Sequence, residues 1–304
     1  MIILILIIIL IIIKNYYYKL GYKFIDNHKM KKIFNEHYNK LNILKPNMNM
    51  NMNINQRIPL NIYQTWHTVD LLPDMKECVN LIKTTNPEFK YYLYDDNMCR
   101  QFINEHFTID VVNAYDNLIP GAYKADLWRY CILYKYGGIY LDIKYKPMNN
   151  FKFITLTDKE YLVLDRPDGI ILKNSWGLYN ALMICLPSNP ILLRCIETIV
   201  YNVKNKIYGC NSLHPTGPAL LGEKYFDSIE KINNIELIHN SVYTLKINSN
   251  GNSLPRFKYI TKMNIIYRNT IILQNYSNYR KDQSKNNKRS YGYLWKKKQI
   301  YSIE

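Results

Sequence analysis

Hydrophobic and polar positions predict strands and helices in alternation from residue 57 onward. Three stretches have the length and composition of strands: IPLNIYQTW (58–66), FKYYLYDD (89–96) and EYLVLD (160–165). Apolar residues recur at helical spacing over about 74–82, 97–106, 121–136 and 190–204. Strands that alternate with helices are typical of an α/β domain with a largely parallel sheet.

The segment KYGGIYLDIKYKP, residues 135–147, predicts the end of a helix, a stop at Gly137 and then a strand. Its side chains alternate between an apolar face of Ile139, Leu141 and Ile143 and a polar face of Tyr140, Asp142 and Lys144. A second carboxylate two residues after Asp142 would complete a clamp for a metal and a nucleotide sugar. The residue in that position is a lysine.

The helix before this strand carries Asp126 and Arg129, which are three residues apart and share a face. An isolated pair of this kind contributes only about 0.2–0.5 kcal/mol and is usually a surface ion pair. Here the pair lies one helix upstream of the polar strand face. Because ligands of open α/β sheets bind at the carboxyl ends of strands, the combination indicates a binding site.

The first residues, MIILILIIILIII, are followed by a lysine and three tyrosines. We expect residues 1–18 to be a hydrophobic membrane anchor, 19–56 a polar low-complexity stalk and 57–304 the folded domain. A divergent signal peptide and a buried segment are the alternatives. An anchor suits a membrane of the secretory pathway, although the lysines after the segment favour a cytosolic location for the rest of the chain.

The net charge of +16 implies an anionic partner such as phosphates, a membrane surface or nucleic acid. The basic, tyrosine-rich end of the chain, residues 279–301, could stack bases and bind phosphates. No signature of a nucleic-acid-binding fold accompanies it, so nucleic acid is not the expected partner. The six cysteines form no C-x-x-C pair, so their spacing does not indicate a zinc site.

The pattern around the strand resembles the DXD sugar-binding region of glycosyltransferases of the family 32 type. That group includes the yeast initiating mannosyltransferase and, more distantly, the clostridial glucosylating toxins. The matching residues are Asp126, Arg129, Tyr130, Leu133, Tyr134, Gly137, Gly138, Tyr140, Asp142 and Pro147. Further similarity lies in IPLNIYQTW, YLYDD, LYNALMICLPSNP, HPTGPALL (214–221) and YLW (293–295), so that it covers roughly residues 57–295.

The resemblance implies a GT-A fold, the Rossmann-like fold of nucleotide-diphospho-sugar transferases, with a mostly parallel sheet and added helices. It also implies transfer of a hexose, with retention, from a UDP- or GDP-sugar to a hydroxyl of a glycan or protein. The residues it places in catalysis are Asp142, Asp126, Arg129 and Trp295, and those in donor binding are Trp66, Tyr140 and Gly138. Lys144 is expected to bind the donor because of its charge and its place on the same strand face, and not because of the resemblance.

By the same resemblance, Trp66 would stack on the nucleobase and Tyr140 would line the nucleotide pocket. Asp126 and Arg129 would bind donor hydroxyls, and Asp142 would hold ribose and sugar hydroxyls. The Trp295 indole N–H would support the leaving phosphate. Both tryptophans could instead be core aromatics.

The sequence leaves the role of one further group of residues open. Asn180 and the turn Thr216-Gly217-Pro218 either shape the acceptor side or are structural. His67 and His214 are expected to be structural.

Lys144 is a departure from the family pattern, because the second aspartate of the family binds a divalent cation, Mg²⁺ or Mn²⁺, that bridges the diphosphate. Three interpretations remain open. A metal could bind through Asp142, water and another carboxylate such as Asp165. Lys144, with Lys146 or the basic C-terminal segment, could replace part of the metal's charge. The chain could also be a degenerate protein that binds a nucleotide sugar without turnover.

Overall fold

The computed structural model describes residues 57–165, 177–226, 235–239, 264–268, 270–285 and 289–302. The expected anchor over 1–18 and stalk over 19–56 lie outside these residues. Among the helices of the described part of the chain, none is long and apolar enough to cross a membrane.

The centre of the domain is a six-stranded sheet in the order β2-β1-β3-β6-β5-β7. Its strands are β1 (Asn61–Thr65), β2 (Lys90–Tyr94), β3 (Gly138–Leu141), β5 (Glu160–Leu164), β6 (Leu178–Cys185) and β7 (Ile235–His239). All pairings are parallel except the two made by β6, which runs antiparallel to both β3 and β5. The predicted α/β class with a mostly parallel sheet is therefore confirmed.

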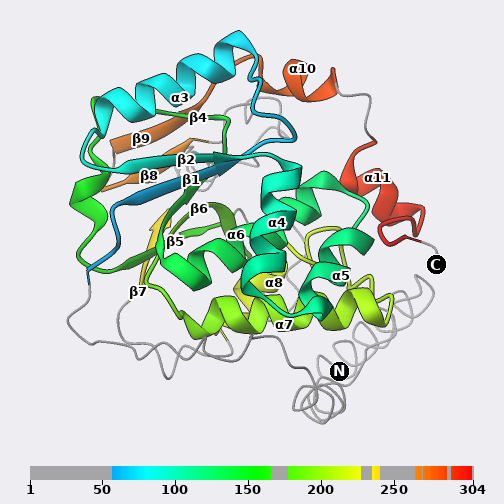
Figure 1. Cartoon of the computed structure of the whole chain (residues 1–304). Coiled ribbons are helices and arrows are strands. Elements are labelled where there is room, and N and C mark those ends of the chain that lie inside the picture. The colour runs from blue at the N-terminus through cyan, green and yellow to red at the C-terminus, as the bar shows by residue number, and fades with distance from the viewer. Residues whose placement is uncertain are drawn as a thin grey trace, which may run out of the picture. The chain divides into compact units, whose positions relative to one another are not determined.

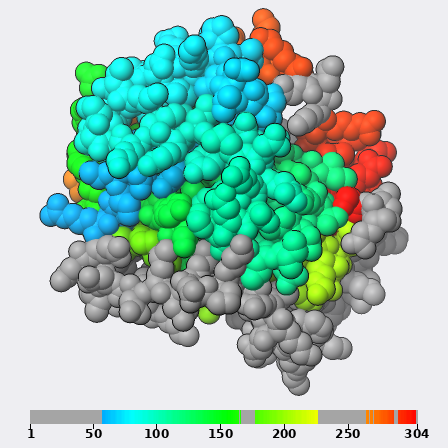
Figure 2. Space-filling model, viewed as in Figure 1, coloured from blue at the N-terminus to red at the C-terminus, as the bar shows by residue number. Residues whose placement is uncertain are grey.

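Helices pack against both faces of this sheet (Figure 1). They are α3 (Pro73–Thr85), α4 (Asp96–His106), α5 (Ile109–Asn117), α6 (Gly121–Tyr136), α7 (Pro190–Lys204) and α8 (Pro218–Phe226). Helices α4 to α8 pack on one another, and α6 and α8 contact strands of the large sheet. Helix α3 lies on the opposite side, where it contacts β4. The side chains of α3, α4 and α5 form much of the face seen in Figure 2.

A second, three-stranded sheet in the order β4-β9-β8 consists of β4 (Tyr145–Pro147), β8 (Ile265–Tyr267) and β9 (Thr270–Asn275). Its residues Tyr145, Ile265, Ile272 and Leu273 are fully buried and share one core with Ile139 and Leu141 of β3 and Ile82 of α3. The short helices η1 (Phe153–Leu156), α10 (Tyr279–Ser284) and α11 (Tyr291–Lys296) complete the described elements. Helix α11 packs on α6.

The glycine pair after α6 is required by its surroundings. Gly137 and Gly138 both have positive φ, of 61° and 102°. A Cβ at Gly137 would lie 2.7 Å from Pro187, and one at Gly138 would lie 2.8 Å from the Asn61 carbonyl oxygen. The predicted helix stop at Gly137 is therefore confirmed, and the two glycines allow β3 to pack directly against β1.

Three local predictions were incomplete. The strand expected to run to residue 147 ends at Leu141, because the Asp142 carbonyl accepts the Tyr145 N–H at 3.1 Å and closes a turn. The chain then continues as β4 in the other sheet. Helix α5 was missed. The expected strand end at residues 95–96 is instead the start of α4, where the Asp95 side chain caps the N–H of Met98 at 2.8 Å.

Candidate functional site

The polar residues singled out from the sequence gather where β1 and β3 end. These strands are parallel neighbours, in register from Ile62 opposite Ile139 and Tyr63 opposite Tyr140, so their carboxyl ends meet at one edge. Gln64 of β1 donates through its amide to the Asp142 carbonyl at 3.2 Å. Tyr91 of β2 in turn donates to the Gln64 side-chain oxygen at 2.7 Å. The turn after β3 is therefore fixed by two neighbouring strands.

The Asp142 carboxylate accepts hydrogen bonds on both oxygens. The Tyr140 hydroxyl reaches Oδ1 at 2.9 Å, and the Arg129 Nη1 reaches the same oxygen at 3.3 Å. The Lys144 ammonium donates to Oδ2. The Arg129 guanidinium also lies over the Tyr140 ring, 4.2 Å from its centroid. The polar face predicted from the alternation thus forms, although the strand itself ends one residue before Asp142.

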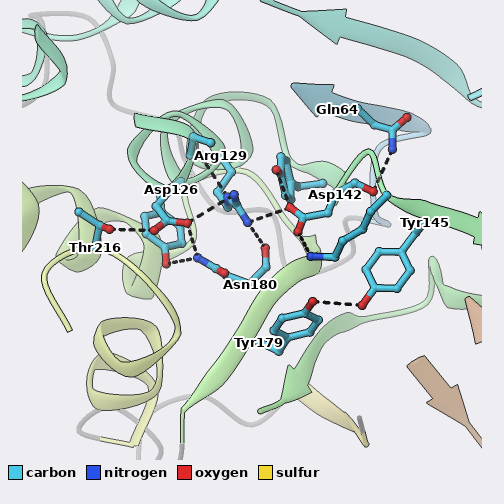
Figure 3. A network of polar contacts seen from close by, with 12 residues as sticks. Gln64, Asp126, Arg129, Asp142, Tyr145, Tyr179, Asn180 and Thr216 are labelled. Atoms are coloured by element: carbon cyan, nitrogen blue, oxygen red, sulfur yellow. Dashed lines mark hydrogen bonds and ion pairs between the residues drawn. The ribbon is translucent and has the colours of Figure 1, made fainter. Parts of the chain in front are cut away.

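Arg129 lies between two carboxylates, as Figure 3 shows. Its Nη2 is 3.4 Å from Asp126 Oδ1, and its Nη1 donates to the Asn180 carbonyl at 2.7 Å. Asp126 also accepts from the Asn180 amide at 2.9 Å and from the Thr216 hydroxyl at 2.8 Å. These four residues are all buried. The surface ion pair that an isolated Asp126–Arg129 spacing would suggest is therefore ruled out, because the pair belongs to a buried network.

The pKa values of the two carboxylates in this network are shifted in opposite directions. Burial by itself would raise the pKa of Asp142, but the charges of Lys144 and Arg129 lower that pKa below its ordinary value. Burial raises the pKa of Asp126, although Arg129, Thr216 and Asn180 act against the rise. Asp142 is thus held ionised, and it is also the more accessible of the two, with 19% of its side chain exposed against 11% for Asp126.

The hydrogen-bonding groups that surround the Asp142 carboxylate do not suit a divalent cation. Both carboxylate oxygens already bind donors, and the two charged donors, Arg129 and Lys144, would repel a metal ion. Asp165 follows β5, and β6 lies between β5 and β3, so about 10 Å of sheet separates the two strand ends. Within the described ranges, no group of three or more His, Cys, Asp or Glu side chains could hold a metal ion.

The two tryptophans expected in the site differ in position. Trp66 directly follows β1 and is half-buried, with its ring 6.2 Å from that of Tyr279 on α10. The Tyr279 ring lies next to the Lys144 ammonium, at 5.8 Å, so Trp66 borders the polar cluster. Trp295 is also half-buried, but its indole N–H donates to the Tyr208 carbonyl at 2.6 Å. Trp295 can support a phosphate only if this bond opens.

Gly138 does not lie beside the cluster. It starts β3, whereas Asp142 follows the end of that strand, a separation of about 13 Å for an extended chain. The space beside it is filled by Asn61 and Tyr63 of β1. The geometry gives Gly138 a role in packing and does not support the expected contact with a donor.

The turn Thr216-Gly217-Pro218 lies against Asp126. A Cβ at Gly217 would approach Asp126 Oδ2 to 3.3 Å, and Asn202 of α7 donates to the Pro215 carbonyl at 3.0 Å, which holds the turn.

His214 pairs with Glu223 at 2.8 Å, as expected of a structural histidine. Gln64 was not predicted as a site residue, although it lies near the end of a strand that is parallel to β3.

Comparison with known proteins supports the resemblance. Residues 73–162, which include Asp126, Arg129 and Asp142, match the family model described as "Glycosyltransferase sugar-binding region containing DXD motif". The resemblance predicted from the sequence is confirmed.

Two relatives come from Schizosaccharomyces pombe. Inositol phosphoceramide mannosyltransferase 2 is 33% identical over 181 residues, which are 55% of this chain and 47% of that protein. Inositol phosphoceramide mannosyltransferase 3 is 38% identical over 90 residues, 28% of this chain and 24% of that protein. This chain therefore matches less than half the length of either relative. A solved structure, the PaToxG glycosyltransferase, aligns with a TM-score of 0.46 at 17% identity, covering 67% of this chain and 78% of that chain.

Proposed function

We propose that this protein is a glycosyltransferase that moves a mannosyl group from a nucleoside diphosphate mannose to a hydroxyl acceptor. The observation that carries the proposal is the ionised Asp142, held at the carboxyl edge of the sheet inside the segment that matches the DXD sugar-binding region. The choice of mannose rests on the relatives, whose names describe mannosyltransferases. The one antiparallel strand, β6, in the otherwise parallel six-stranded sheet suits a GT-A-like domain.

Asp142 is the residue that we place in contact with the donor, where it would accept hydrogen bonds from ribose and sugar hydroxyls. Arg129 and Asp126 are less exposed and already bonded to each other and to Asn180, so they act as positioning residues for Asp142. Trp66, half-buried at the end of β1, offers a ring face for the nucleobase. Tyr140 fixes the carboxylate through its hydroxyl.

We propose that the reaction is substitution with retention, as the resemblance to family 32 glycosyltransferases implies. The bond between the anomeric carbon and the β-phosphate oxygen breaks, and the nucleoside diphosphate leaves with the electron pair. The acceptor oxygen bonds to the anomeric carbon on the same face and transfers its proton to the departing phosphate oxygen. Asp142 is bonded on both oxygens to its neighbours, which makes it a poor nucleophile for a covalent intermediate.

The acceptor class is also a proposal. Several relatives carry inositol phosphoceramide in their names, so an anionic lipid headgroup with free hydroxyls is the first acceptor to test. The net charge of +16 would attract such a headgroup and an acidic membrane surface. Together with the hydrophobic residues 1–13, this favours a membrane-bound enzyme of the secretory pathway. Retention of the full-length protein in membranes after carbonate extraction would support this location, and release would contradict it.

The test is turnover by the full-length chain in detergent with GDP-mannose, UDP-glucose and UDP-galactose, with an inositol phosphoceramide and a mannoside as acceptors. We expect release of the nucleoside diphosphate with GDP-mannose, no release of UDP from either UDP-sugar, and an α-linked product in the proton NMR spectrum. A β-linked product would contradict retention. Binding of GDP-mannose without turnover, in the presence of every acceptor, would favour a binding protein, an alternative suggested by the Lys144–Asp142 ion pair.

A further inference from the structure

Lys144 is enclosed by one carboxylate and three aromatic rings. Its ammonium donates to Asp142 and lies 5.3 Å from the Tyr145 ring centroid, 5.2 Å from that of Tyr179 and 5.8 Å from that of Tyr279. The rings come from β4, β6 and α10, three elements far apart in the sequence. The residue is only 9% exposed. Such a cage attracts a cation through the negative faces of the rings.

The cage also fixes the charge state of the lysine. Burial alone would lower the pKa of Lys144, but Asp142 and the neighbouring tyrosines raise it above its ordinary value. The ammonium therefore stays charged at physiological pH. An ammonium has three N–H donors, of which Asp142 accepts one and Tyr179 a second, so the third is the one that a phosphate oxygen would accept.

Lys144 occupies the place in the sequence where the DXD pattern has its second aspartate, beside a carboxylate that already pairs with two cationic side chains. A nucleoside diphosphate that leaves a sugar gains negative charge on its β-phosphate, and catalysis needs a positive charge beside it. The residues around Asp142 do not suit a divalent cation, whereas the caged ammonium already supplies a compact positive charge at the same edge.

If the proposed transferase function holds, we propose that the Lys144 ammonium binds the donor diphosphate in place of a divalent cation, so that donor binding needs no metal. Asp142 would then keep the ammonium in position and bind donor hydroxyls. A contact between an ammonium and phosphate is screened by salt more than coordination to a metal is, so nucleotide binding should weaken as ionic strength rises.

The first test needs no variant. Binding of GDP and of UDP to the full-length chain is measured by calorimetry in EDTA and again in excess Mn²⁺. We expect one nucleotide to bind in EDTA with a dissociation constant within about twofold of its value in Mn²⁺. Binding that is at least tenfold tighter in Mn²⁺ would overturn the inference and leave the transferase proposal standing. Failure of both nucleotides to bind in either condition would overturn both proposals.

A second test uses a variant to ask whether replacing Lys144 makes nucleotide binding depend on a divalent cation. In Lys144→Asp, nucleotide binding in EDTA should fall at least tenfold and recover with Mn²⁺, and the Mn²⁺ electron paramagnetic resonance signal should show bound metal. Lys76→Asp is the matched control, because Lys76 is an exposed lysine in the first turns of α3 and has no part in the proposed site. The control should bind nucleotide in EDTA as the natural chain does. Unchanged binding by Lys144→Asp in EDTA, with a normal thermal midpoint, would overturn the inference. If that variant does not fold, the measurement on the natural chain decides.

Discussion

Two arginines of this domain make ion pairs whose geometry and surroundings contrast. Arg100 of α4 contacts both oxygens of Asp116 through Nε and Nη2, at 2.7 to 3.1 Å, and half of its side chain is exposed. Arg129 of α6 lies 3.3 and 3.4 Å from Asp142 and Asp126, and 7% of its side chain is exposed. The surface pair has the shorter contacts. The buried residue, however, is the sole charged partner of Asp126 among the contacts drawn in Figure 3.

The contrast teaches that burial, and not contact distance, decides which arginine the structure depends on. Water can replace the partner of an exposed charge, whereas a buried carboxylate that loses its cation keeps an uncompensated charge in a medium of low dielectric constant. The buried pair also serves the proposed function, because Arg129 fixes the carboxylate that would meet the donor. Substitutions at both pairs and at their neighbours can test this contrast.

Replacement of Arg129 by methionine should have the largest effect. It leaves Asp126 and Asp142 without their shared guanidinium, and removing one partner of a buried pair costs about 3–5 kcal/mol. We expect this loss in the free energy of unfolding measured by urea denaturation, together with loss of donor turnover. A loss below about 1 kcal/mol would contradict the importance given to burial.

The pair Asp142 and Lys144 should show strong coupling in a double-mutant cycle. Asp142→Asn and Lys144→Met each leave one charge without its partner, whereas the double variant removes both charges. We expect the double variant to be more stable than the sum of the single losses predicts, by about 1–3 kcal/mol. Additive losses in urea denaturation would show that the two groups do not interact in solution.

Gln64 offers an intermediate test through an uncharged group. Gln64→Met keeps the volume of the side chain but removes the donor to the Asp142 carbonyl and leaves the Tyr91 hydroxyl without its acceptor. We expect a loss of about 1–3 kcal/mol of stability. The turnover number should fall by a larger factor than the Michaelis constant for the sugar donor rises. The reason is that the turn loses its position while the groups that bind the sugar donor remain. The reverse split would mean that Gln64 contacts the donor.

The pH dependence of stability should separate the two carboxylates. The pKa of Asp142 is lowered in the folded state, so its contribution is present above about pH 4, the value of an unfolded aspartate, and is lost as the pH falls through the folded pKa. The pKa of Asp126 is raised, so its contribution is present below about pH 4 and is lost as the pH rises through the folded pKa. In urea denaturation from pH 3 to 7, Asp142→Asn should therefore lower stability most at pH 7. Asp126→Asn should do so most at pH 3, and equal profiles would contradict the assigned directions.

Replacement of Arg100 by methionine should have the smallest effect. The exposed guanidinium and Asp116 both regain water, so we expect no measurable change in the urea midpoint or in turnover. A loss comparable to that of Arg129→Met would show that contact geometry, and not burial, governs both pairs.

Much of the domain could be predicted from local pattern. Helix α6, its stop at Gly137 and the α/β class follow from apolar spacing and glycine chemistry, and the polar face of Tyr140, Asp142 and Lys144 does form. The division of residues 138–147 between two sheets could not be predicted. Strand pattern is the same on both sides of Asp142, and only the position of β9 determines where the chain leaves the first sheet.

The site was predicted in part for a similar reason. Asp126, Arg129 and Asp142 lie close together in the sequence, and the packing of α6 against β3 brings them into contact. Tyr179 and Tyr279 reach Lys144 through tertiary packing that no local spacing encodes. The Trp295 hydrogen bond to Tyr208 also depends on how α11 packs, so the sequence alone could not show that its N–H is engaged.

The Tyr276 N–H donates to the Lys144 carbonyl at 3.1 Å, and this bond bears on when the turn can form during synthesis of the chain. The turn that carries Lys144 is held in place by β9 and the residues directly after it, about 130 positions later in the chain. At a translation rate of about 5–20 residues per second, on the order of ten seconds separates the two segments on the ribosome. During that interval the nascent chain has its acidic and basic residues but lacks the strand that aligns them. The turn therefore takes its final position only after β9 and Tyr276 have been synthesised, and a shorter nascent chain lacks the alignment of Asp142 and Lys144.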